Sequence, residues 1–148
     1  MRVAVVTIFP EMFDALTEYG VTRRAFEKNI IEIKYFNPRD FTDDIHNSID
    51  DRPYGGGPGM VMSPEPLKNA IVEAKQWINS RVTIIYLSPQ GKLMNQSRIK
   101  ALSEEENLIF LAGRYEGIDE RIIMNHVDYE LSIGDYIVSG GEFPAMVM

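Results

Sequence analysis

The sequence contains no cysteine among its 148 residues. This absence excludes a disulfide framework, a thiolate metal site and a cysteine nucleophile, and it fits a cytoplasmic protein. No apolar run approaches the roughly 20 residues that a membrane-spanning helix needs. The apolar run within residues 1–8 is too short for a signal peptide and lacks a cleavage site of small residues. We therefore expect a cytoplasmic protein that does not associate with membranes.

Positive charge is also scarce, because the sequence has 15 Lys and Arg but 22 Asp and Glu, which gives a net charge of −7. A protein that binds nucleic acid by itself usually presents a basic surface, and neither half of this chain is basic. The remaining composition, 45% apolar and 25% charged, is that of a folded globular protein. A chain of this length is sufficient for one domain with its own core.

Short apolar runs alternate along the chain with segments of helical periodicity. The expected strands are residues 2–8, 31–35, 82–87, 108–111 and 127–131, and the expected helices are 10–20, 21–28, 63–78, 95–102 and 118–124. Gly20 should end the first helix, and residues 88–91 should end the third strand. This alternation is typical of an α/β fold with a mainly parallel sheet flanked by helices.

Two segments do not fit this alternation. Residues 37–62 are rich in Asp, Pro and Gly and have no period, and a loop of that length is usually functional or mobile. Residues 140–148 begin like a helix but show no cap, no glycine stop and no basic last turn. We expect the chain to be cut from a longer protein at this point.

Three glycine-containing loops, residues 87–91, 112–117 and 132–141, follow expected strands. Ligands of open α/β sheets bind at the carboxyl ends of the strands, so these loops are expected to meet at one pocket. Each glycine alone is more simply explained as an ordinary turn residue. Their recurrence in all three loops favours a pocket in which exposed backbone contacts the ligand, for example the edge of an adenine ring.

The glycine run within residues 52–60 does not match a known phosphate-binding loop. The chain has no Gly-Lys pair followed by Ser or Thr, and Met60 stands where a dinucleotide fingerprint needs glycine. The run is therefore interpreted as a flexible lid or, alternatively, as a mobile surface loop. His46 and His126 share no ligand spacing, and the sequence specifies no metal site.

Four motifs and the segment 9–13 (FPEMF) carry a family resemblance. The motifs are residues 50–60 (DDRPYGGGPGM), 86–91 (YLSPQG), 113–121 (GRYEGIDER) and 132–142 (SIGDYIVSGGE). In this order they resemble the bacterial tRNA (guanine-N1)-methyltransferases of the SPOUT class, from Phe9 to the last residue.

The resemblance implies a fold and an activity. Members of this family tie a deep trefoil knot near their last strands, bind S-adenosyl-L-methionine bent in the knot, and act as homodimers. They methylate N1 of guanine 37 of tRNA, next to the anticodon. Residues 1–148 would then be the cofactor-binding domain, without the linker and the C-terminal domain that helps to hold the tRNA.

The resemblance also assigns residues to the site. Carried over position by position, the cofactor site would consist of Tyr86, Leu87, Ser88, Pro89, Gly113, Ile133, Gly134, Asp135, Tyr136, Ile137, Val138, Gly140, Gly141 and Pro144. Asp50 and Glu116 match positions near the substrate, and Glu116 is a candidate ligand of a magnesium ion. The catalytic Asp of the family and its assisting Arg lie beyond Met148. The resemblance thus implies that this chain binds the cofactor and transfers almost no methyl by itself.

Two alternative functions stay open beside this hypothesis. One is a methyltransferase of the same class that acts on ribosomal RNA. The other is a non-catalytic α/β domain that binds a ligand in the three glycine-containing loops. A cofactor-dependent rise in melting temperature and a comparison of tRNA with rRNA fragments as substrates distinguish them.

Overall fold

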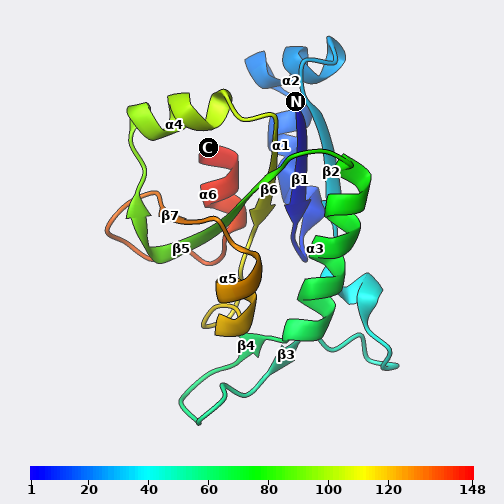
Figure 1. The fold of residues 1–148 in the computed structure, drawn as a ribbon, viewed down its shortest axis with the longest axis vertical. Helices are drawn as coiled ribbons and strands as arrows, with labels where there is room; N and C mark the ends of the chain where they lie inside the picture. The colour runs from blue at the N-terminus through cyan, green and yellow to red at the C-terminus, as the bar shows by residue number, and fades with distance from the viewer.

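The computed structural model describes residues 1–148, and a five-stranded parallel sheet runs through its centre (Figure 1). The order of the strands is β2-β1-β6-β5-β7. Their bounds are β1 Arg2–Val6, β2 Glu32–Phe36, β5 Thr83–Leu93, β6 Asn107–Leu111 and β7 Tyr129–Ser132. Every neighbouring pair in this sheet is parallel. The predicted α/β fold with a mainly parallel sheet is confirmed.

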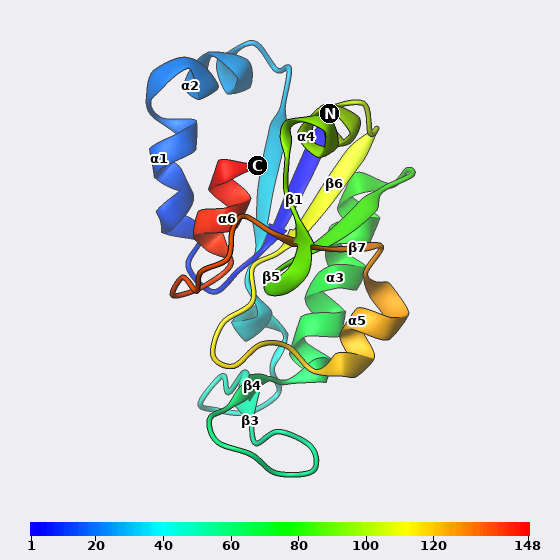
Figure 2. The ribbon, with the colours of Figure 1, turned by 90° about the vertical axis from the view of Figure 1, so that its left-hand side faces the viewer.

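Helices cover both faces of the sheet (Figure 2). On one face lie α3 (Pro64–Ile78) and α5 (Glu120–His126). On the other lie the 3-10 helix η1 (Pro10–Phe13), α1 (Asp14–Thr17), α2 (Gly20–Glu27), α4 (Gln96–Ser103) and α6 (Glu142–Val147). Apolar residues at helical spacing determine which face each helix buries. In α3, for example, Leu67, Ile71 and Ile78 are at most 2% exposed.

Strand β5 does not end where its proline and glycine predict. It continues through Pro89 and Gly91 to Leu93, with a shift of register in which Leu131 pairs first with Leu87 and then with Lys92. A ladder irregularity of this kind tolerates proline and glycine inside a strand. The backbone of Gly91 lies against β7, because a Cβ built there would be 2.4 Å from the Leu131 amide nitrogen.

The first helical segment also differs from its prediction. It consists of η1 and α1 and ends at Thr17, and Gly20 begins α2 instead of closing the preceding helix. Gly20 has φ +68°, a conformation that favours glycine, so it forms the corner between the two helices. Ser63 holds the N-cap position of α3 as expected, although its side chain makes no capping hydrogen bond.

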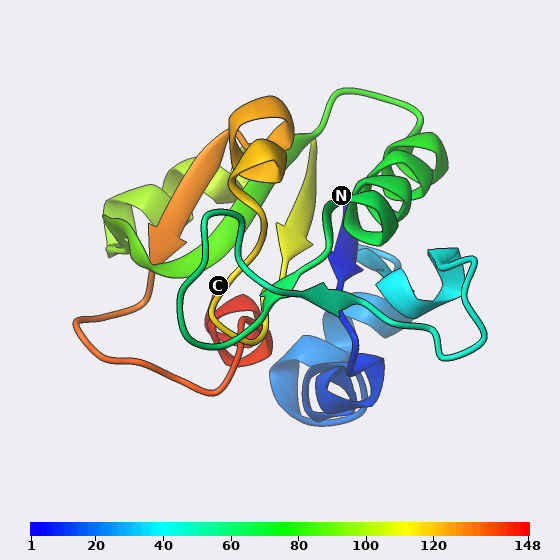
Figure 3. The ribbon, with the colours of Figure 1, turned by 90° about the horizontal axis from the view of Figure 1, so that it is seen from below.

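The long segment 37–62 carries more structure than its composition predicts. It contains the 3-10 helix η2 (Pro38–Phe41) and a small antiparallel pair, β3 (Asp50–Asp51) and β4 (Val61–Met62). Ile49 and Met62 are each 1% exposed and anchor this pair in the core. The intervening chain extends away from the body, as Figures 1 and 2 show, and Figure 3 looks onto this segment from below. We call residues 50–60 the lid.

The longest helix, α3, has 15 residues, and no helix of the structure could span a bilayer.

Candidate functional site

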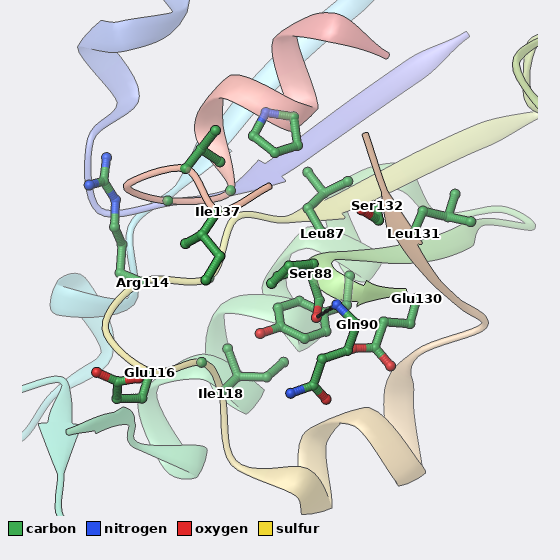
Figure 4. A pocket seen from close by; sticks show the side chains of 18 of the residues that line it. Leu87, Ser88, Gln90, Arg114, Glu116, Ile118, Glu130, Leu131, Ser132 and Ile137 are labelled. Atoms are coloured by element: carbon green, nitrogen blue, oxygen red, sulfur yellow. Dashed lines mark hydrogen bonds between the residues drawn. The ribbon is translucent and has the colours of Figure 1, made fainter. Parts of the chain in front are cut away.

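A cavity of about 380 Å³ lies where β5, β6 and β7 reach their carboxyl ends (Figure 4). Its wall consists of residues 86–90, 113–118, 130–133 and 136–141, together with Glu120, Ile123 and Pro144. The three loops that the sequence singled out therefore do meet at one place. The volume lies in the range of small-molecule binding sites.

Tyr86 forms a buried part of this wall. Its side chain is 6% exposed, and burial raises the pKa of its phenol to about 12. The phenol is therefore neutral at physiological pH. Gly113 fits closely against the ring, since a Cβ there would be 2.8 Å from Cε2 of Tyr86. A side chain at position 113 would push Tyr86 out of the wall.

The loop after β7 contributes mostly backbone. The amide of Gly141 donates to the carbonyl of Gly113 at 2.9 Å, which joins this loop to the loop after β6. The hydroxyl of Ser132 donates to the carbonyl of Gly134 at 2.8 Å. Tyr136 and Ile137 are 57% and 86% exposed, so their apolar surfaces stand at the open side of the cavity. Such a wall suits a ligand with a flat ring and few charges.

The ionisable groups of the cavity are mainly acidic. Arg114 is its one cation, and its guanidinium is paired with the buried carboxylate of Glu142 at 2.9 Å. Glu116, Glu120 and Glu130 also line the cavity. The cavity is therefore better suited to a ligand with exposed positive charge than to an anion.

The lid is attached to the cavity through backbone hydrogen bonds. The amide of Met62 donates to the carbonyl of Gly117 at 2.9 Å, and the amide of Glu116 donates to the carbonyl of Met60 at 2.9 Å. The side chain of Glu116 lies against Gly59, where a Cβ would be 2.3 Å from its Cγ. A movement of the lid would therefore be transmitted directly to Glu116.

Comparison with known proteins identifies the family. The family model described as tRNA (Guanine-1)-methyltransferase TrmD matches residues 1–148. The chain belongs to this family. A curated tRNA (guanine-N(1)-)-methyltransferase of Pseudomonas putida (strain W619) is 57% identical over 148 residues, which are 100% of this chain and 59% of that protein. A protein of the same name from Pseudomonas savastanoi pv. phaseolicola is 55% identical over the same shares.

A solved structure agrees with this membership. The crystal structure of tRNA (m1G37) methyltransferase from Aquifex aeolicus is 39% identical and superimposes with a TM-score of 0.85, over 99% of this chain and 66% of that one. The chain spans about three fifths of the length of the curated relatives it matches.

The cavity brings together most of the residues that the family resemblance assigns to the cofactor. Gly134 and Asp135 alone among them do not line it. Gly134 instead lies beneath the ring of Tyr136, since a Cβ there would be 2.1 Å from Cε1 of that ring. Of the two candidates near the substrate, Glu116 lines the cavity and Asp50 does not. Asp50 lies in β3 at the base of the lid, paired with Met62.

Several wall residues were not singled out from the sequence. Residues that line the cavity include Gln90, Arg114, Ile118, Glu130 and Ser132. Behind this wall Glu142 pairs with Arg114, and the hydroxyl of Thr7 donates to Glu142. Arg114 and Glu142 both lie in the family motifs, but they are 28 positions apart in the sequence. Only the three-dimensional fold shows that they form a pair.

No group of three or more His, Cys, Asp or Glu side chains in the structure could hold a metal ion. Glu116 therefore belongs to no such group. A magnesium ion bound there would depend on oxygen atoms of water or of a ligand, as is usual for this ion.

Proposed function

We propose that this chain forms the S-adenosyl-L-methionine site of a methyltransferase that modifies N1 of guanine 37 in tRNA. The observation that carries the proposal is the single cavity at the carboxyl ends of β5, β6 and β7, lined by three of the four family motifs. The names of the relatives support tRNA as the substrate and guanine N1 as the methylated atom. A tRNA substrate also supports a cytoplasmic location.

The wall of the cavity fits this cofactor. The backbone groups of Ile133, Tyr136 and Val138 would hold the adenine, which carries hydrogen-bond donors and acceptors on its edge. The acidic side chains at the cavity suit the positive charges of the sulfonium and the ammonium group. When bound, S-adenosyl-L-methionine supplies a methyl group activated by the positively charged sulfur.

The chemistry at guanine N1 requires the removal of its proton. A general base must come within hydrogen-bond distance of that atom, and such a base typically contributes on the order of 10² to 10⁴ in rate. Glu116 at the cavity and Asp50 at the base of the lid can assist. The family resemblance assigns the main base to a position beyond Met148, so we propose that residues 1–148 alone bind the cofactor and transfer almost no methyl.

We propose that the protein is a homodimer. A groove of about 700 Å³ lies on the sheet face covered by α1, α2, α4 and α6, and 18 of its 22 lining residues are hydrophobic. Next to it α6 exposes 45% of Phe143, and Val147 in the groove is 66% exposed. An apolar surface of this extent is typical of an interface between subunits.

We also propose that the chain is knotted after β7. Residues 92 and 93 pair with β7 beyond the register shift, and the amide of Met94 donates to the carbonyl of Ser132 at 2.7 Å. After β7 the chain returns to the end of β6, where the amide of Gly141 donates to the carbonyl of Gly113. These contacts support a segment 88–94 that loops around the chain leaving β7, an arrangement that few folds contain.

The experiment that tests the function uses labelled S-adenosyl-L-methionine and an unmodified tRNA with guanine at position 37. We expect a version extended to the length of the relatives to methylate this tRNA, and residues 1–148 to reach at most about a hundredth of its rate. Transfer to rRNA fragments in preference to tRNA would identify the other substrate. Cofactor binding without transfer by the extended version would indicate a non-catalytic domain.

A further inference from the structure

An ion pair behind the cofactor loop joins a partly exposed guanidinium to a fully buried carboxylate. Nε of Arg114 donates to Oε2 of Glu142 at 2.9 Å, and the side chain of Glu142 has no exposed surface. The hydroxyl of Thr7, itself fully buried, donates to Oε1 of Glu142 at 2.8 Å. Both carboxylate oxygens therefore have a partner, as a charge in this environment requires.

The same guanidinium contacts two segments of the chain, residues 139–142 and residues 9–12. Besides Glu142 in α6, its Nη1 donates to the carbonyl of Ser139 at 2.9 Å. Its Nη2 lies 3.4 Å from Sδ of Met12, and its Cζ lies 4.5 Å from the centre of the Phe9 ring. The planar guanidinium, with its five N–H donors, can contact all of these groups at once, whereas a lysine ammonium cannot.

Gly140 shows how closely this side chain is packed against the cofactor loop. A Cβ at Gly140 would be 2.3 Å from Nε of Arg114, so the guanidinium fills the space that a side chain would need. The next residue, Gly141, bonds to the carbonyl of Gly113. Residues 139–141 are therefore held between the side chain of Arg114 and the backbone of Gly113. Figure 4 shows Arg114 beside the loop that follows β7.

We infer that Arg114, oriented by Glu142, is a positioning residue that sets the shape of residues 137–141 and thereby the affinity for the cofactor. Arg114 acts through the carbonyl of Ser139 and the packing of Gly140. The inference rests on the proposed cofactor site, because residues 137, 138, 140 and 141 belong to that site. It adds a network of Thr7, Arg114 and Glu142, which the relatives' names do not assign.

The test compares Arg114→Lys and Glu142→Gln with a matched control, Arg2→Lys. Arg2 resembles Arg114 in its contacts, since it pairs with Glu32 at 3.0 Å, donates to the carbonyls of Trp77 and Ile78, and stacks 5.6 Å from the Trp77 ring. It lies at the start of β1, at the opposite end of the strand from Thr7. Arg114→Lys and Arg2→Lys therefore both remove the contacts of an arginine guanidinium. Only Arg114 lies next to the cofactor loop.

Two measurements are made on each variant. Hydrogen exchange without ligand gives the exchange rate of the Gly141 amide. The amide of Asp128, which donates to the carbonyl of Ile84, is the internal reference. Calorimetry reports the dissociation constant of S-adenosyl-L-methionine. For Arg114→Lys and Glu142→Gln we expect about tenfold faster exchange at Gly141 relative to Asp128, and about tenfold weaker cofactor binding. Arg2→Lys should change both by less than about twofold.

The outcomes separate this inference from the proposed function. If the unmodified chain does not bind S-adenosyl-L-methionine, the proposed function fails, and the exchange at Gly141 still tests the network. If the chain binds and Arg114→Lys leaves both affinity and exchange unchanged, the inference is overturned. If Arg114→Lys does not fold, Gly140→Ala is used instead, since its methyl group displaces the guanidinium and keeps both charges. Unaltered affinity in that variant likewise overturns the inference.

Discussion

The backbone amide of Met62 donates to the carbonyl of Gly117 at 2.9 Å, so β4, which directly follows the lid, is fixed to the loop that follows β6. The returning bond from the amide of Glu116 to the carbonyl of Met60 makes this a two-point attachment. The lid and the cavity at the carboxyl ends of β5, β6 and β7 are thus connected through the backbone of residues 116 and 117. Its remaining residues have few contacts, and a segment of this kind opens at low free energy.

Gly59→Ala should disturb Glu116 and reduce methyl transfer. Gly59 has φ +80°, and its added methyl group would meet the side chain of Glu116 at 2.3 Å. Gly56→Ala is the matched control, because Gly56 has φ +86° but no atom within 4 Å. In the extended version we expect Gly59→Ala to lower kcat by about tenfold or more, and Gly56→Ala to lower it less. Equal losses in steady-state assays would contradict a role for Glu116.

Gly91→Ala should destabilise the fold strongly. Its added methyl group would lie 2.4 to 2.7 Å from backbone atoms of Glu130 and Leu131, which no rotamer change can relieve. Chemical unfolding should show a loss of about 2 to 3 kcal/mol in the free energy of unfolding. Gly134→Ala is the control, because its methyl group would meet the ring of Tyr136, which can turn away. A similar stability for the two variants would argue against the close passage of β5 over β7.

The sequence predicts most of the elements because their signals are local. The apolar spacing of Leu67, Ile71 and Ile78 indicates α3, and the burial of these residues confirms it. The end of β5 was predicted wrongly because it depends on pairing with Leu131, some forty residues later along the chain. Proline and glycine mark a stop only where no partner strand compensates for them.

The candidate site, like the fold, could be predicted from the sequence only in part. The motifs indicate three loops, and the parallel topology brings their residues to one end of the sheet. The motifs do not show that Asp50 lies outside the cavity, nor that Arg114 meets Glu142. Those relationships depend on how distant segments pack in three dimensions. The functional roles of the lining residues remain predictions.

His126 should make the protein less stable in mild acid. Burial, and then the positive charges of Lys75 and Lys68, lower the pKa of its imidazole in the folded chain. The unfolded chain takes up this proton near pH 6.5, before the folded chain does, so the free energy of unfolding falls as the pH drops below about 6.5. His126→Asn should lose less stability between pH 7.5 and 5.5 in urea titrations. His46→Asn, in an exposed loop, is the control and should behave as the unmodified chain does.

Val147→Asp should weaken the proposed dimer. Val147 lines the apolar groove and is 66% exposed, and a carboxylate there could not be buried without a partner. Met124→Asp is the control, since Met124 is 78% exposed on α5, which covers the opposite face of the sheet. Light scattering at micromolar concentration should give twice the chain mass of 16.9 kDa for the unmodified chain and for Met124→Asp. A monomer in the unmodified chain would refute the dimer.

The most direct test of the proposed function is a crystal structure of residues 1–148 with S-adenosyl-L-methionine bound. We predict that the adenine lies in the cavity at the carboxyl ends of β5, β6 and β7, with hydrogen bonds to backbone groups of Ile133, Tyr136 and Val138. The sulfonium should lie on the side of the cavity where Glu116 stands. An adenine bound beside His46 or against residues 55–59 of the lid would contradict the proposed site.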